Sequence, residues 1–152
     1  MRKLFFTTFV FLIALFLLFP GVSLAISIAA TGGWSETIDK DDLVSGAGSD
    51  LKSSYESASG ATLLTISGCT GDTDTWKVRV SRTDYNWHSN FVLYVRRGED
   101  DYQAITTTDS DFFSGAGDTA NIALQYKLTG MSVQIPPATY STTITYTVVD
   151  TE

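Results

Sequence analysis

The only histidine, His88, lies in a polar stretch with Asp84 and Ser89 close by, and these are the residue types of a serine hydrolase triad. A triad needs members that distant parts of a fold bring together, and neighbours in one loop do not meet that need. One histidine and one cysteine, Cys69, are too few ligands for a zinc site. No stretch has the Asp-x-Asp-x-Asp-Gly spacing of a calcium loop. We therefore expect a protein that is not an enzyme and that uses no metal or cofactor.

The same stretch holds aromatic residues that could bind a ligand. Tyr85, Trp87 and His88 are flanked by Asn86 and Asn90. Aromatic rings stack on the C–H faces of sugars, and amides hydrogen-bond to sugar hydroxyls. We expect the three aromatic residues to lie exposed on one loop as the best candidate ligand contacts, which would suit a carbohydrate-binding module. Trp34 or Trp76 could add a further ring for stacking. The competing interpretation is that the tryptophans fill the core.

The N-terminus, residues 1–25, has the three parts of a secretory signal peptide. Two cations precede an apolar run over residues 4–19, and the small residues Ser23 and Ala25 follow it. The run is shorter than the roughly 20 residues that span a bilayer, so we predict cleavage after Ala25, with an uncleaved anchor as the alternative. Residues 26–152 then form a single β-sandwich domain that is secreted to the exterior, the cell surface or the periplasm, without stable membrane insertion.

The chain is acidic, with a formal net charge of −7 at pH 7, and removal of the basic signal peptide makes it more acidic still. Such a surface repels nucleic acids and anionic lipids, which excludes both as expected partners. The single cysteine, Cys69, has no partner for an internal disulfide. It is either a small buried hydrophobic residue or a thiol that is available to another chain.

The elements that must position these residues are predicted to be β-strands. The closing stretch 140–150 alternates with period two, which predicts a half-buried strand. Pro136 and Pro137 lack backbone donors and set its starting point. Its predicted core face carries Tyr140, Thr142, Ile144, Tyr146 and Val148, and its outer face carries Ser141, Thr143, Thr145, Thr147 and Val149.

Earlier strand patterns recur with turn residues between them, and no long segment has a helical period. The first two of them, 61–67 and 76–82, are predicted to form a hairpin. The fold class that we predict is an all-β, immunoglobulin-like or pilin-like Greek-key β-sandwich of seven to eight strands, with a closed barrel as the alternative. The further strand patterns cover residues 91–97, 102–107 and 122–128.

The order of these landmarks resembles that of the spore coat protein U and Csu-type fimbrial subunit domains of bacteria. Most of the matching strings are strands or turns, and the last is a proline turn followed by tyrosine and alternating threonines. The strings are Thr65-Ile-Ser-Gly-Cys-Thr-Gly71, Trp76 to Val80, Phe91-Val-Leu-Tyr-Val95, Gly115-Ala-Gly117, Ile122 to Leu128 and Ile135 to Val148. One departure is that the family pairs the cysteine at the Cys69 position with a second one, which this chain lacks.

The resemblance implies a subunit whose sandwich is completed by a strand from a neighbour. Ile26, Ile28 and Ala30 have the period of such a donated strand, and the alternative is that they form the first strand of their own subunit. The function that we expect is therefore a secreted, non-catalytic structural or surface protein, such as a pilus, filament or extracellular-matrix subunit that binds its neighbours. The alternative is a carbohydrate-binding module that binds a glycan through loop aromatics.

Overall fold

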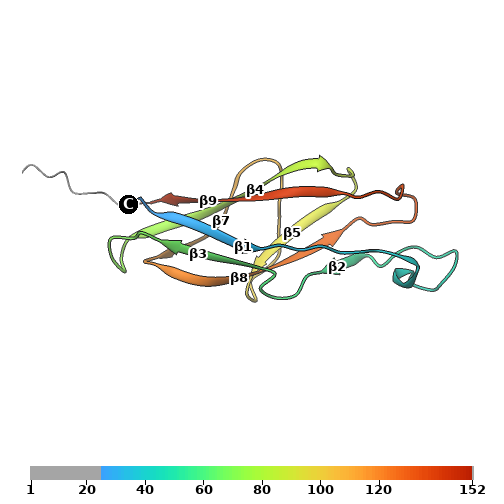
Figure 1. The fold of residues 1–152 in the computed structure, drawn as a ribbon, viewed down its shortest axis with the longest axis horizontal. Helices are drawn as coiled ribbons and strands as arrows, with labels where there is room; N and C mark the ends of the chain where they lie inside the picture. The colour runs from blue at the N-terminus through green and yellow to red at the C-terminus, as the bar shows by residue number, and fades with distance from the viewer. Residues whose placement is uncertain (1–24, 152) are drawn as a thin grey trace, which may run out of the picture.

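The computed structural model describes residues 25–151, and within them almost all regular structure is β-strand (Figure 1). The predicted signal peptide lies outside the described residues except for Ala25, so its cleavage stays a prediction. The strands are β1 (Ser27–Gly32), β2 (Ser54–Glu56), β3 (Thr62–Ser67), β4 (Thr75–Asn86), β5 (Val92–Arg97), β6 (Gln103–Ala104), β7 (Ser110–Ala116), β8 (Thr119–Thr129) and β9 (Ser141–Asp150), with one 3-10 turn at Lys40–Asp42.

The strands form two antiparallel sheets that pack face to face. The first sheet has the order β1-β3-β8-β5-β6, with β2 also paired to β8, and the second has the order β7-β4-β9. This arrangement fits the predicted β-sandwich. The described residues hold nine strands rather than seven or eight, because β2 and β7 lie outside the predicted strand patterns, whereas β6 lies within the predicted stretch 102–107. With only three residues, β2 is too short to show an alternating pattern.

The predicted hairpin of residues 61–67 and 76–82 is wrong. These segments are β3 and β4, and they belong to different sheets. The turn residues between them lead the chain across the sandwich, where the Asp74 carboxylate accepts a hydrogen bond from the backbone N–H of Thr70 (2.8 Å). Gly, Asp and Thr residues predict that the chain turns, but they do not say whether the next strand pairs with the last one or crosses to the other sheet.

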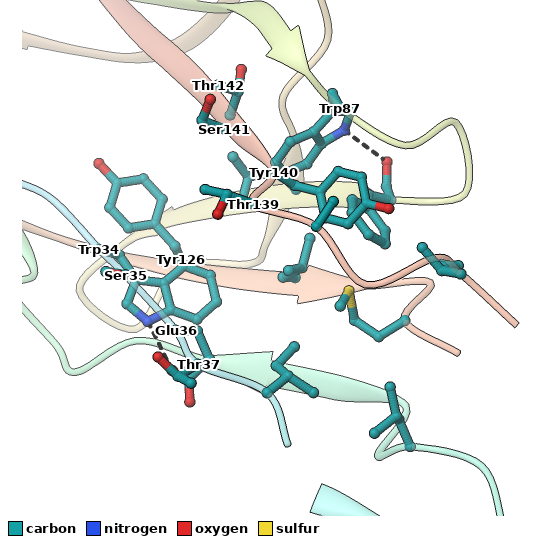
Figure 2. A pocket seen from close by; sticks show the side chains of 18 of the residues that line it. Trp34, Ser35, Glu36, Thr37, Trp87, Tyr126, Thr139, Tyr140, Ser141 and Thr142 are labelled. Atoms are coloured by element: carbon teal, nitrogen blue, oxygen red, sulfur yellow. Dashed lines mark hydrogen bonds between the residues drawn. The ribbon is translucent and has the colours of Figure 1, made fainter. Parts of the chain in front are cut away.

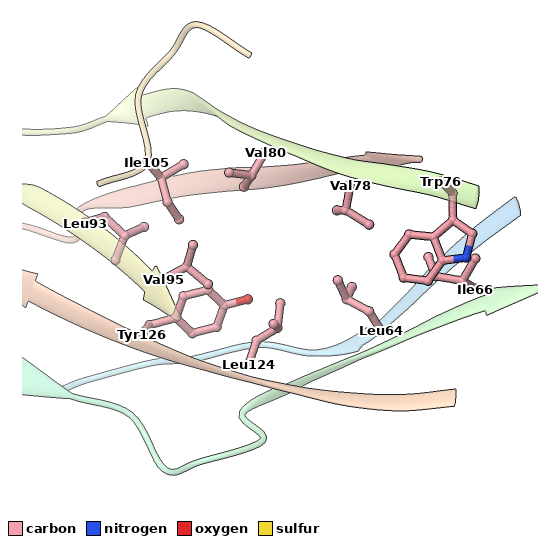
Figure 3. Packing of buried hydrophobic residues seen from close by; sticks show 10 residues of the cluster. All are labelled: Leu64, Ile66, Trp76, Val78, Val80, Leu93, Val95, Ile105, Leu124 and Tyr126. Carbon is pink, nitrogen blue, oxygen red and sulfur yellow. The ribbon is translucent and has the colours of Figure 1, made fainter. Parts of the chain in front are cut away.

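The core lies between the sheets, and ten buried side chains fill it (Figure 3). In the first half of β4, every second residue from Trp76 to Val80 is buried, so the predicted core face with Trp76, Val78 and Val80 is confirmed. Trp76 is also tied by its indole N–H to the carbonyl of Gly117 (2.9 Å). The remaining members are Leu64, Ile66, Leu93, Val95, Ile105, Leu124 and Tyr126.

The single cysteine is half-buried and packs against this core. Its backbone N–H donates to a carboxylate oxygen of Asp118 (2.9 Å). Partial burial of the Cys69 thiol and the neighbouring Asp118 carboxylate both raise the pKa of the thiol. Since the thiolate is the reactive form, this position suits the first alternative, a small hydrophobic residue, better than a reactive thiol.

The closing strand β9 has the two faces that its sequence predicts. Ile144, Tyr146 and Val148 pack against the core, and every predicted outer-face residue from Ser141 to Val149 is exposed. β9 pairs with β4 along nearly its whole length, from Ser141 to Asp150. Among the described strands it pairs with no other, so its second edge has no strand partner.

The two faces of β9 should differ in stability measurements. We expect Ile144→Ala to lower the free energy of unfolding by about 2 kcal/mol, because it removes half-buried methyl groups and leaves a void. Thr145→Ala, the matched change on the outer face, should cost less than about 1 kcal/mol. Chemical unfolding of both variants measures the difference, and equal losses would contradict the assignment of the faces.

Candidate functional site

The sandwich is open along one side, where a groove of about 1110 Å³ runs beside the unpaired edge of β9 (Figure 2). One wall is the start of β9 and the residues before it, 138–146, and the other is the segment 33–40 that follows β1. The floor includes Leu93 and Leu128 from the first sheet and Ile144 from the second. The groove is therefore an unfilled space between the two sheets with an apolar floor.

Local sequence explains why the sandwich stays open here. Gly32, at the end of β1, has a φ of 103°, and a Cβ atom there would lie 2.3 Å from the carbonyl oxygen of Ala61. The chain turns out of the sheet at this glycine, and Gly33 makes the last backbone bond, to Ala61 (2.8 Å). Within the described part of the chain, residues 34–38 form no backbone–backbone hydrogen bond. On the opposite wall, Pro136 and Pro137 have no N–H to offer.

One tryptophan belongs to the wall formed by residues 33–40. Trp34 packs against the core cluster, and its indole N–H donates to Glu36 Oε2 (3.2 Å) in the same segment. The segment 34–38 is thus held by side-chain packing rather than by a sheet ladder. A segment with few backbone bonds opens at lower free energy than the strands around it.

A cluster of aromatic rings lines the groove beside the start of β9. The Phe91 ring meets Tyr140 edge-on, with ring centroids 4.9 Å apart, and Trp87 in the same way at 5.4 Å. Trp87 is fixed further by its N–H bond to the Phe91 carbonyl (3.3 Å) and by the Arg82 guanidinium over its ring (5.2 Å). Rings held this firmly form a wall of fixed shape.

The expectation that Tyr85, Trp87 and His88 share one exposed loop is wrong in its geometry. Tyr85 lies in β4 at a bulge and is 71% exposed, while Trp87 and His88 are half-buried. Of the three, only Trp87 lines the groove. His88 instead packs on the Phe91 ring and accepts the Asn90 backbone N–H at Nδ1 (3.2 Å). The bulge, which shifts the alternation of side chains, is the physical reason for the separation.

Two tyrosine hydroxyls form a polar chain in the groove's inner part. The Tyr126 hydroxyl donates to Thr62 Oγ1 (2.8 Å) and shares a hydrogen bond with the Tyr146 hydroxyl (3.0 Å). Burial, and then the neighbouring Tyr126, raise the pKa of Tyr146 far above its ordinary range. The phenol therefore stays neutral and holds the two sheets together at this point.

This burial predicts a loss of stability in alkali. The unfolded state releases the Tyr146 proton above about pH 10, whereas the folded state retains it. The contribution of this group is therefore complete below pH 10, and stability falls above it by up to about 1.4 kcal/mol per pH unit. Unfolding curves between pH 9 and 11 should show the decline. Tyr146→Phe should flatten it, and an unchanged slope in that variant would contradict the prediction.

A loop carboxylate, Asp50, holds together two segments that line the groove. Asp50 accepts backbone N–H bonds from Val133 and Leu51, both 2.9 Å, and a hydroxyl bond from Ser132 (3.2 Å). These bonds, with Val133 contributing most, lower the pKa of Asp50 below its ordinary value. The loop before β2 is thereby tied to the residues that precede β9.

Two of the candidate donated residues, Ile28 and Ala30, lie in the chain's own first strand, and Ile26 directly precedes it. In this structure the three residues therefore belong to their own subunit, which is the alternative to donation. In β1, Ile28 pairs with Ile66, and Ala30 pairs with Leu64. Ile26 and Ile28 pack against the core, whereas Ala30 is exposed and lines the groove. β1 lies between β3 and the end of β9, so it fills one end of the open side and the groove continues beyond it (Figure 1).

Sequence patterns missed most of the groove. Trp34, an additional stacking candidate in the sequence, does line the groove, but the Tyr126–Tyr146 pair is not predicted as part of a site, because its two strands are brought together only by the fold. The one available signal was the alternation of β9, which places Tyr146 on its inner face. Among residues 25–151, no group of His, Cys, Asp or Glu side chains is arranged to hold a metal ion. No helix in that range is long and apolar enough to cross a membrane.

Comparisons with protein-family models, with curated proteins and with solved structures find no match to this chain.

Proposed function

We propose that the chain is a secreted, non-catalytic structural or surface protein that assembles with its neighbours by strand donation, as a subunit of a pilus, filament or extracellular matrix. The observation that carries the proposal is the open side of the sandwich. There the edge of β9 that pairs with no described strand faces residues 34–38, which form no backbone–backbone hydrogen bond to any described residue, across an apolar groove. An extended segment of a neighbour would satisfy both edges and cover the apolar floor.

The strand order supports an immunoglobulin-like or pilin-like Greek-key sandwich with one strand missing. In an immunoglobulin domain the strands ABED form one sheet and CFG the other. β1, β3, β8 and β5 follow the order of ABED, and β4 and β9 correspond to C and F. The position of strand G, beside β9, is the groove. This correspondence supports strand addition as the way in which the sandwich is completed.

A carbohydrate-binding module is the second candidate, and the aromatic walls of the groove favour it. Trp34, Trp87 and Tyr140 line the space, and Glu36 and Thr142 offer oxygen atoms for sugar hydroxyls. Glycan-array binding that is lost in Trp87→Ala would support this function. The absence of glycan binding, together with multimer formation, would leave strand donation as the better account.

The experiment for the first candidate compares two proteins by sedimentation and electron microscopy. The secreted protein should form multimers or filaments, and a variant without Ile26 to Ala30 should not, because the donated residues are lost. In a self-contained module the same deletion would only lower the melting temperature of a protein that was monomeric from the start. That result would contradict strand donation.

A further inference from the structure

We infer that the groove binds a cationic polysaccharide, a polymer of amino sugars with free, protonated amino groups, in preference to neutral and acidic glycans. The inference rests on the second proposed function, glycan binding in the groove, and adds the chemical class of the glycan. Because the groove is open along one side of the sandwich, a polymer chain can lie in it lengthwise. The two walls differ in charge, and this difference selects the ligand.

The wall on the β9 side is uncharged and suits a sugar. Residues 131–146 contain no Asp, Glu, Lys, Arg or His. Rings and hydroxyl-bearing side chains line the groove there, from Trp87, Thr139, Tyr140 and Thr142 (Figure 2). Aromatic rings pack on the C–H faces of sugars, and hydroxyl groups hydrogen-bond to sugar hydroxyls. This wall therefore accepts a glycan but does not discriminate by charge.

The opposite wall and the loop after it carry an excess of negative charge. Residues 36–52 hold two lysines and five carboxylates, namely Glu36, Asp39, Asp41, Asp42 and Asp50. Lys40, which lines the groove, lies 2.6 Å from Asp41. Lys52 lies 2.9 Å from Asp42. Both lysines are thus already paired within the segment, and the other three carboxylates form no ion pair with any described residue.

Two of these carboxylates without an ion pair, Glu36 and Asp39, line the groove itself, and both are exposed. Glu36 accepts the indole N–H of Trp34 through Oε2 (3.2 Å), so its charge is held beside an aromatic ring (Figure 2). Asp39 accepts the backbone N–H of Asp41 through Oδ1 (2.8 Å) as the cap of the 3-10 turn. The wall therefore presents two negative charges, one of them next to a ring on which a sugar can stack.

Charge then separates the classes of glycan. Protonated amino groups are attracted to the carboxylates of one wall and meet no cation on the other, whereas the anionic groups of an acidic polysaccharide are repelled. A neutral glycan gains the stacking and hydrogen bonds alone. Because both carboxylates are exposed, each contributes up to about five-fold in affinity, and added salt screens the attraction.

Three matched probes test the class of ligand. Titration calorimetry in mildly acidic buffer compares an oligomer of glucosamine, its fully N-acetylated form and an oligogalacturonate of equal length. N-acetylation removes the positive charge and keeps the sugar ring, so we expect it to weaken binding by about ten-fold. The acidic oligomer should bind most weakly, and high salt should reduce the difference. Equal affinity for the free and the acetylated oligomer would contradict the inference.

Charge-removing variants locate the site. Glu36→Gln and Asp39→Asn each remove one charge at nearly constant shape, and asparagine can still cap the 3-10 turn. Together they should weaken glucosamine binding by about ten-fold and leave binding of the acetylated oligomer unchanged. Glu99→Gln, at an exposed carboxylate outside the groove, is the matched control and should change neither. Unchanged glucosamine binding in the double variant would overturn the inference.

The remaining outcomes separate this inference from the function on which it rests. If the acetylated oligomer binds and the glucosamine oligomer does not, glycan binding stands and the cationic class is wrong. If no oligomer binds, both are wrong, and strand donation is judged by sedimentation alone. An oligolysine that binds as tightly as the glucosamine oligomer would show recognition of charge without a sugar, which also contradicts the inference.

Discussion

Replacement of Trp76 by alanine should lower the free energy of unfolding by about 3–5 kcal/mol, a large share of the total stability of a domain of this size. The indole is 2% exposed and packs edge-on against Phe113, with ring centroids 6.0 Å apart. Its N–H is satisfied by the Gly117 carbonyl. Truncation removes the ring, leaves a cavity between the sheets and deprives that buried carbonyl of a donor.

The control for this change is another large aromatic residue on the same strand. Tyr85 is 71% exposed, so Tyr85→Ala should cost less than about 0.5 kcal/mol. Urea unfolding of the two variants, followed by far-ultraviolet circular dichroism, gives both values. Similar costs at the two positions would mean that Trp76 does not carry the core of the sandwich.

Local alternation is what the sequence predicts well. On β4 and β9 it assigns the buried and exposed faces correctly, because the side-chain period of a strand depends only on neighbouring residues. The all-β class follows from the same signal. The proline pair before β9 likewise marks where the strand begins, since Pro136 and Pro137 cannot join a ladder.

What the sequence does not predict is the pairing of distant segments. β3 and β4 look like a hairpin, yet they lie in different sheets, since equally alternating strands fit either sheet. The groove combines Trp34, Trp87, Tyr126 and Ile144, which come from four parts of the chain. A single bulge near Tyr85 was enough to separate three aromatic residues that stand together in the sequence. Long-range packing decides these features, and no local pattern records it.

The second large effect concerns a glycine that lies under the buried indole. A Cβ atom at Gly115 of β7 would lie 2.4 Å from the Trp76 ring, closer than any real contact allows. Gly115→Val should therefore cost about 3 kcal/mol, because the ring is held by Phe113 and by its hydrogen bond and cannot move away cheaply.

A double-mutant cycle tests whether that cost comes from the contact with the ring. The smaller ring in Trp76→Phe makes room at Gly115, so Gly115→Val should be less destabilising in that background by at least about 1 kcal/mol. Gly71→Val, at a glycine whose Cβ would meet no atom within 4 Å, is the matched control and should cost less than about 1 kcal/mol. Strictly additive costs for Gly115→Val and Trp76→Phe in urea unfolding would show that the two residues do not constrain each other. The close packing of β7 on β4 would then have to depend on other contacts, such as the ion pair between Lys77 and Asp111.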